Sequence, residues 1–434
     1  AGEVVDTVTT DDTGLAESEP LYLGKYEIRE ITAPYGMVLN GEVHTAELTY
    51  AGQEIEITET AASFYNERQK ATVTLDKILE QNEQFGIGAN GEITTVTFGL
   101  FAAEDVTAAD GSVIPADGLL EILSVDEGGH AVCKTDLPFG SFYFKELSTD
   151  EHYILSDKKY PFEFSYMGQD TALVEIKAND GEAIGNKLIY GEIHGLKKDE
   201  NGNALGGAVI GLFKPDCTEF ITENAIMSAI SDEDGSFSFA NVPFGNWVVH
   251  EIEAPAGFVL SDKSFVVTID KDGAIIEVEI ENTLIRGNVQ LTKTDRDYPD
   301  NKLTGAKFTV YRDSNGDKAF DENDEKIGEL SEVSTGVYEM HDLTYGGYFV
   351  KEQQAPEGFC LDENAYYFEI TEHGKTVTVE NETGKGFVNT PQVGSLKIVK
   401  TSSDGKVEGF SFRVTGSNGY SEVFVTDENG EIFI

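Results

Sequence analysis

The sequence predicts an all-β protein, built as a tandem array of modules that together form an elongated rod. Three observations predict this fold. Short alternating runs are punctuated by Gly, Asp and Asn, three sequence blocks recur along the 434 residues, and the spacing between two of these blocks is constant. A chain of this length is also too long for one ordinary domain.

Alternation of apolar and polar residues marks the expected strands. Runs such as SFSFANVP (236–243) and GKTVTVE (374–380) have a period of two and are bounded by turn residues. Side chains two apart in a strand share a face, and such runs joined by Gly, Asp or Asn are typical of hairpins. Helical periodicity is scarce by comparison, which favours an all-β fold.

Three short blocks recur, and each ends in one kind of polar residue. YFVKEQQAPEGF (348–359) represents the block whose strand ends in glutamate, NVQLTK (288–293) the lysine block, and VEIEN (278–282) the asparagine block. The glutamates are Glu30, Glu146, Glu251 and Glu352; the lysines are Lys77, Lys197, Lys293 and Lys400; the asparagines are Asn66, Asn186, Asn282 and Asn389. Such recurrence predicts repeated structural units.

The step from the asparagine of one block to the lysine of the next lysine block is always 11 residues: 66 to 77, 186 to 197, 282 to 293 and 389 to 400. The steps from lysine to glutamate vary (69, 54 and 59), as expected if insertions fall in loops. One module therefore ends and the next begins across a short, fixed joint. This leaves little free linker and predicts a stiff rod.

The blocks divide the chain into five ranges. Residues 69–188, 189–285 and 286–392 are complete modules, 1–68 is the C-terminal part of a module, and 393–434 is the N-terminal part of another. Either the sequence is a piece of a longer chain, or the two partial modules complement each other between molecules. TDENG (426–430) and TDDTG (10–14) resemble the same turn, and this overlap weighs against complementation. No secretory signal or anchor is recognisable, as expected for a piece.

The three polar residues share strand faces with apolar residues. Glu352 points with Tyr348 and Val350, and Lys293 points with Leu291. Each complete module thus directs one Lys, one Glu and one Asn toward its core. A buried ion pair, or strand-end residues that reach water, would be the structural explanation. A buried Lys–Glu pair gains little net stability, however, so its repetition calls for another reason.

Chemistry supplies that reason. Burial lowers the pKa of a lysine and raises that of a glutamate, and a neutral amine is a nucleophile. A neutral carboxyl can hydrogen-bond to the asparagine carboxamide and move protons. An amine that reaches the carboxamide carbon can displace ammonia and form an amide cross-link. The three residues together therefore predict a covalent bond that the module makes within itself.

At these residues the chain resembles the Cna-B-type (prealbumin-like) repeats of Gram-positive surface adhesins and SpaA-type pilins. Lys293, the stretch 348–359 and Asn389-Thr390 carry the motifs V-x-L-x-K, Y-x-V-x-E-x-x-A-P-x-G-[FY] and N-T, and Lys197, 247–258 and Asn282-Thr283 match almost as well. The resemblance implies β-sandwich modules of reversed immunoglobulin type, Lys–Asn isopeptide bonds, and glutamate as the catalyst.

The implied cross-links join Lys77 to Asn186, Lys197 to Asn282 and Lys293 to Asn389, with Glu146, Glu251 and Glu352 as catalysts. Glu30 is the corresponding catalyst in the first range. In the partial modules, Asn66 and Lys400 have no counterpart to cross-link with.

Two neighbouring residues compete for these roles, and one module departs from the motif. Lys198 adjoins Lys197, but the constant step of 11 and the alternation of the strand favour Lys197. Asn381 precedes Asn389, but the step of 11 to Lys400 favours Asn389. In residues 69–188, LSTD follows Glu146 in place of the A-P pair.

Composition narrows the function. The net charge of −48 and the pI near 4.3 argue against binding to nucleic-acid phosphates. No apolar run reaches membrane-spanning length. The cysteines, Cys133, Cys217 and Cys360, are widely spaced, so we expect free thiols that are buried as small hydrophobes.

DSNGDKAFDEND (313–324) resembles a calcium-binding EF-hand loop, although Lys318 replaces the usual Gly and no helices flank it. Its alternative is an acidic surface loop of Asx turns. No cofactor is required elsewhere, so calcium is the one metal that the sequence suggests. The candidate ligands are Asp313, Asn315, Asp317, Asp321 and Asp324, with the carbonyl of Ala319.

The sequence therefore favours a stalk or pilus-like fibre on the outer surface of a Gram-positive cell wall, with neighbouring modules or subunits as partners. Adhesion to a host protein or glycan is the alternative. An enzyme acting on an external substrate is not expected.

Calcium binding can be tested by chelation. We expect EDTA to lower the melting temperature of the chain, because an ion that binds only the folded state stabilises it by mass action. An unchanged melting temperature would leave 313–324 as an acidic loop.

Overall fold

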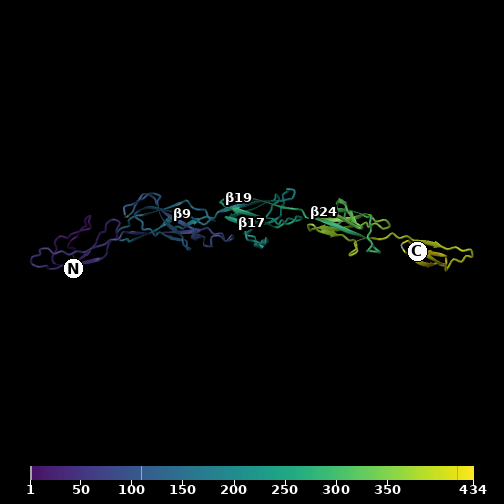
Figure 1. Cartoon of the computed structure of the whole chain (residues 1–434), viewed down its shortest axis with the longest axis horizontal. Coiled ribbons are helices and arrows are strands. Elements are labelled where there is room, and N and C mark those ends of the chain that lie inside the picture. Colours follow the sequence, from purple (N-terminus) through teal and green to yellow (C-terminus); the bar gives the residue numbers. More distant parts are fainter. Residues whose placement is uncertain (1, 109, 418) are drawn as a thin grey trace.

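The computed structural model describes residues 2–108, 110–417 and 419–434. The described chain is a row of small β units arranged along one axis, with the two termini at opposite ends (Figure 1). Its only helical elements are three short 3-10 turns, η1 (Glu92–Thr95), η2 (Ala178–Gly181) and η3 (Thr222–Asn224). The predicted all-β, rod-like array is confirmed.

The range 189–285 shows the plan of a complete module as two facing sheets. One sheet has the order β16-β13-β19 and the other β15-β14-β17-β18. The strands are β13 (Tyr190–Asp199), β14 (Val209–Phe213), β15 (Met227–Ile230), β16 (Ser236–Pro243), β17 (Gly245–Glu253), β18 (Ser264–Ile269) and β19 (Ala274–Asn282).

The range 286–392 repeats this plan. Its sheets have the orders β23-β24-β20-β27, with β28 also on β20, and β22-β21-β25-β26. The strands are β20 (Arg286–Asp295), β21 (Lys307–Arg312), β22 (Glu325–Glu329), β23 (Ser331–Ser334), β24 (Val337–Thr344), β25 (Gly346–Gln354), β26 (Ala365–Ile370), β27 (Thr376–Thr378) and β28 (Phe387–Asn389).

The range 69–188 has the same two sheets, β11-β3-β12 with β8 on β3, and β10-β9-β4-β7, and adds the hairpin β5–β6. The strands are β3 (Lys70–Leu79), β4 (Thr97–Ala102), β5 (Val106–Thr107), β6 (Val113–Ile114), β7 (Leu119–Ser124), β8 (His130–Val132), β9 (Gly140–Ser148), β10 (Lys159–Phe164), β11 (Leu173–Lys177) and β12 (Ile184–Asn186).

The two partial modules hold only hairpins and short pairs. β1 (Gly24–Arg29) pairs with β2 (Val43–Leu48), β29 (Lys397–Val399) with β32 (Glu431–Phe433), and β30 (Ser411–Thr415) with β31 (Ser421–Val425). In the described residues no strand pairing crosses the expected module boundaries, which themselves stay predictions.

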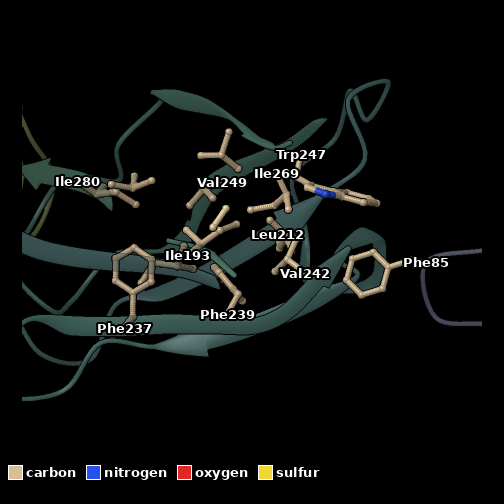
Figure 2. Packing of buried hydrophobic residues seen from close by; sticks show 14 of the residues in the cluster. Phe85, Ile193, Leu212, Phe237, Phe239, Val242, Trp247, Val249, Ile269 and Ile280 are labelled. Carbon is tan, nitrogen blue, oxygen red and sulfur yellow. The ribbon is translucent and has the colours of Figure 1, made fainter. Parts of the chain in front are cut away.

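Each complete module has its own apolar core between its two sheets. The core of 189–285 also receives residues from the preceding range, among them Phe85 and Ile87. The rings of Phe85 and Trp247 meet edge to face with centroids 4.8 Å apart (Figure 2). Gln84 donates to the carbonyl of Ile226 beside this contact. A loop of one module therefore closes the end of the next core.

The joints repeat one set of backbone contacts. Ile285, three residues after an asparagine of the third block, donates its N–H to the Gly257 carbonyl (2.8 Å) and accepts the N–H of Tyr345 (2.9 Å). Ile189 does the same between His152 (2.8 Å) and Phe244 (3.0 Å). Each of these residues is thus held from both sides, which supports the prediction of a stiff joint.

An aromatic residue seven positions before each core glutamate packs on the module that precedes it. The Phe244 ring lies 5.5 Å from the ring of His152, measured between centroids. Tyr345 lies over Gly257, where an added Cβ would come within 3.2 Å of the ring. Gly257 also has a φ of +90°, so the joint uses both the open space and the conformational freedom of glycine.

The three cysteines are free, as predicted, but the prediction that they are buried is wrong. Cys133 and Cys217 are half-buried and Cys360 is exposed. Cys133 directly follows β8, and Cys217 and Cys360 lie in loops, so no strand alternation carries these side chains inward. Burial and the nearby Glu121 carboxylate raise the pKa of the Cys133 thiol to about 12.

The joint contact can be tested with Tyr345→Ala. Loss of the ring over Gly257 should let the joint bend, so small-angle X-ray scattering should give a smaller radius of gyration at unchanged secondary structure. Tyr298→Ala is the control, because that side chain is 71% exposed. Equal radii for the two variants would contradict the proposed stiffness.

Candidate functional site

Parallel pairing of the first and last strands brings lysine and asparagine together. In β13 and β19, Lys197 lies opposite Ile280, and Asn282 comes two residues further along. The other modules have the same register, since Lys77 lies opposite Ile184 and Lys293 opposite Phe387. Because side chains two apart share a face, each asparagine points to the same side as its lysine.

The glutamate comes from the facing sheet. β9, β17 and β25 carry Glu146, Glu251 and Glu352 into the space between the two sheets. All nine side chains of the three complete modules are buried; the least buried residue, Asn186, is 4% exposed. The structure thus brings the predicted site residues of each complete module together in a dry interior.

In 69–188 the three side chains touch one another. The amine of Lys77 donates to Asn186 Oδ1 at 2.6 Å and lies 3.4 Å from Glu146 Oε1. Asn186 Nδ2 donates to both oxygens of Glu146 at 2.9 Å. The departure of this module from the motif after Glu146 does not disturb the contacts.

The same triangle recurs in 189–285. Lys197 Nζ donates to Asn282 Oδ1 and lies 3.4 Å from Glu251 Oε1. Asn282 Nδ2 donates to that same oxygen at 3.0 Å. The carboxamide therefore turns its oxygen toward the amine and its nitrogen toward the acid.

In 286–392 the triangle is left without its full set of hydrogen bonds. Lys293 Nζ lies 3.1 Å from Glu352 Oε1, but the angles of this contact do not make a hydrogen bond. Among the described residues, Lys293 Nζ, Glu352 Oε1 and Asn389 Oδ1 are buried without a hydrogen-bond partner. Asn389 Nδ2 donates to Glu352 Oε2 at 2.8 Å. Buried polar atoms without partners are costly and call for an explanation.

Burial lowers the pKa of all three lysines, against the attraction of the neighbouring glutamate. The effect is largest for Lys293, whose pKa falls to about 8. Its surroundings explain this, because Nζ faces the ring of Phe387 at 4.8 Å from the centroid in place of water. A lowered pKa increases the share of neutral, nucleophilic amine.

The competing residues lie outside the triangles. Lys198 points to the opposite strand face and pairs with Glu279 at 2.6 Å. The Asn381 side chain donates to Asp362 and exchanges hydrogen bonds with the backbone of Val388. The constant step of 11 therefore selected the residues that the structure brings together.

The partial modules hold parts of the same site. Asn66 Nδ2 donates to Glu30 Oε2 at 2.7 Å, as in the complete modules. Lys400 donates to the carbonyl of Thr401 and lies over the ring of Phe410.

Further groups that the sequence did not indicate also hold the carboxamides. Asn66 and Asn389 donate to the carbonyls of Val38 and Cys360, which stand eight residues after Glu30 and Glu352. Asn186 donates instead to the hydroxyl of Thr149. Backbone carbonyls leave no mark in a residue pattern, so only a constant spacing could have indicated them.

The loop 313–324 folds with its carboxylates bonded to its own backbone. Asp313 accepts the N–H groups of Gly316 and Lys318, and Lys318 Nζ pairs with Glu369 at 2.6 Å. Across the described part of the chain, no group of three or more His, Cys, Asp or Glu side chains is arranged to hold a metal. Calcium in this loop stays a prediction.

The pKa of Lys293 makes stability depend on pH when the cross-link cannot form. Burial lowers the pKa of the Lys293 amine from 10.5 to about 8. Asn389→Ala keeps this amine free, because the cross-link cannot form. The unfolded state then binds more protons between these values, so the free energy of unfolding should rise with pH across this window. At about 1.4 kcal/mol per pH unit, the rise is at most about 3 kcal/mol.

Chemical unfolding at several pH values measures this slope. Lys293→Met/Asn389→Ala is the control, since it lacks the titrating amine. If both variants show the same dependence on pH, Lys293 does not titrate as described.

The described residues contain no helix long and apolar enough to cross a bilayer.

Comparison with known proteins places the chain in a family. The model of the SpaA prealbumin-like fold domain matches residues 1–61, 191–284 and 287–384, more than half of the chain. The trypsin-resistant surface T6 protein of Streptococcus pyogenes is 28% identical over 142 residues, which is 32% of this chain and 25% of that protein. The chain thus matches only a quarter of this curated relative.

Solved structures show weaker similarity. The Bacillus anthracis TIE protein is 22% identical at a TM-score of 0.48, covering 72% of this chain and 51% of its own. BcpA, the major pilin subunit of Bacillus cereus, is 15% identical at a TM-score of 0.34, covering 75% of this chain and all of its own. On the strength of the domain matches, this chain belongs to the SpaA family of prealbumin-like fold domains.

Proposed function

We propose that this chain is part of a stalk or pilus-like fibre on the surface of a Gram-positive bacterium, and that its complete modules are tied by Lys–Asn isopeptide bonds which they form themselves. One observation carries the proposal. In each complete module a buried Lys, Glu and Asn meet at the contact between the first and last strands.

The geometry supports amide formation. The neutral lysine amine attacks Cγ of the asparagine, and the new C–N bond replaces the bond from Cγ to Nδ2. Glutamate takes a proton from Nζ and delivers one to the departing Nδ2, which leaves as ammonia. Glutamate ends in the protonation state in which it began. The contacts of Glu251 with both Lys197 Nζ and Asn282 Nδ2 suit this transfer.

The reaction also relieves an electrostatic cost. A buried lysine and glutamate lose the solvation that water gives to charge, and their attraction returns little net stability. An amide carries no charge. The buried atoms without hydrogen-bond partners at Lys293, Glu352 and Asn389 belong to the residues that take part in the reaction. The reaction joins Lys293 to Asn389, and Glu352 transfers the proton.

The position of the bond suits a part that carries tension. Force enters a module at its first strand and leaves at its last, so a covalent tie between these strands bypasses the rest of the module. Closing a loop of roughly a hundred residues would also stabilise by about 4–5 kcal/mol if the bond acts like a disulfide. Because the three cysteines are free, they do not form a disulfide that could stabilise a module in this way.

Membership in the SpaA family and the surface location in the name of the streptococcal relative support a place outside the cell. Neighbouring modules or subunits of a fibre are the proposed partners, and the only proposed reaction is directed at the chain itself. Adhesion to a host protein or glycan is the second candidate.

Mass spectrometry tests the cross-links. The intact chain should be lighter than its sequence by three ammonia molecules, one for each complete module. In Glu352→Ala the deficit should fall to two, with the bond between Lys293 and Asn389 missing from the peptide map. Glu357→Ala, at an exposed glutamate in the loop that follows β25, should keep all three. A wild-type mass equal to that of the sequence would refute the proposal.

Mechanical pulling tests the role. The wild-type complete modules should not extend between the linked strands, whereas Glu352→Ala should release the length of one module. Equal extension of the two proteins would show that the cross-link does not carry the load.

A further inference from the structure

All four glutamates of the site accept a hydrogen bond from a backbone N–H ten residues further along. This spacing is constant although the modules differ in length. The donors and their distances to Oε2 are Asn40 to Glu30 (2.6 Å), Ser156 to Glu146 (2.8 Å), Ser261 to Glu251 (2.8 Å) and Asp362 to Glu352 (2.9 Å).

The side chain of each donor residue closes a local turn. It accepts the backbone N–H two residues later, with distances of 2.8 Å for Asn40, 3.3 Å for Ser156, 3.4 Å for Ser261 and 3.0 Å for Asp362. Asn, Ser and Asp are the residues whose short side chains form such turns. The position ten residues after each of these four glutamates therefore combines a turn-forming side chain with an N–H that donates to the glutamate.

Because of this N–H, the two carboxylate oxygens have different partners. In each complete module Oε2 accepts the N–H, while Oε1 faces the lysine amine at 3.4, 3.4 and 3.1 Å. The last torsion of a glutamate side chain is broad, so sterics alone do not fix its oxygens. A donor on the backbone, held by its own turn, fixes one oxygen and thereby aims the other.

We propose that Asn40, Ser156, Ser261 and Asp362 are positioning residues for the cross-linking reaction. In the three complete modules the turn holds the glutamate with Oε1 on the amine, where it takes the proton from Nζ that balances the loss of ammonia at Nδ2. Asn40 holds Glu30 in the same way in the first range, which lacks the lysine of the site. This inference rests on the proposed function. Without the turn the carboxylate rotates away for part of the time, and bond formation slows by roughly tenfold or more, as small misplacements of catalytic groups do.

A time course on the full chain tests the proposal. Protein made in a cell-free pulse is quenched with acid, digested, and assayed for the cross-linked peptides of each complete module. Ser261→Ala should slow only the formation of the bond between Lys197 and Asn282. The rates in the other two complete modules serve as internal controls. Ser261→Asn should restore the rate, because Asn40 occupies the same position in the first range. Ser156→Ala repeats the test with the bond between Lys77 and Asn186.

The matched control is Asp234→Ala. Asp234 closes a similar turn in the same module, accepting the N–H of Ser236 at 2.9 Å, and it is not among the contacts of Glu251. This variant should form the bond at the wild-type rate.

The outcomes separate the two claims. Wild-type protein without cross-linked peptides would refute the proposed function. Wild-type cross-linking with unchanged rates in both serine variants would overturn the positioning role alone. That role would also be overturned if Asp234→Ala slowed the reaction equally, or if Ser261→Asn failed to restore it, since either result indicates general destabilisation.

Discussion

A lysine amine enclosed between two β-sheets is the constraint on which each complete module depends. Lys77, Lys197 and Lys293 have almost no contact with water. An ammonium group in that position is tolerated only beside a carboxylate, and removing one partner of such a pair costs about 3–5 kcal/mol. The glutamate of the facing sheet must therefore be present and inward. The asparagine carboxamide lies between them, and burial of each of the three polar groups depends on the presence of the other two.

The strand order converts this local constraint into a property of the whole rod. Parallel pairing of the first and last strands makes the site a junction between the entry and the exit of the module. The lysine of the next site follows only 11 residues after the asparagine of each site. With the proposed bonds in place, tension passes from bond to short joint to bond. The apolar cores then maintain the shape of the sites and carry little of the force.

Alternation with a period of two was enough to place the site residues, because a strand leaves only two faces. It directed Glu352 inward with Tyr348 and separated Lys197 from Lys198. Spacing alone chose Asn389 over Asn381. What the pattern could not supply was the position of main-chain groups. The N–H of Ser261 reaches Glu251 because of a turn, and no side-chain pattern indicates where an N–H points.

Contacts between modules escaped prediction for a related reason. Tyr345 on Gly257 and Phe85 on Trp247 join residues that belong to different repeats. A comparison of repeats reveals what each has in common with the others, and it does not reveal which surfaces face each other. Cys360 is exposed because it lies in a segment without strand alternation, where the apolar character of a residue does not decide which way its side chain points.

Phe85 makes the core of 189–285 depend on a residue that precedes it in the chain. The residue that closes this core lies more than a hundred positions before its strands and is synthesised first. A chain that emerges from its N-terminal end therefore presents a finished aromatic cap before Trp247 arrives. The sandwich of 189–285 can therefore fold against a surface that the preceding module already presents.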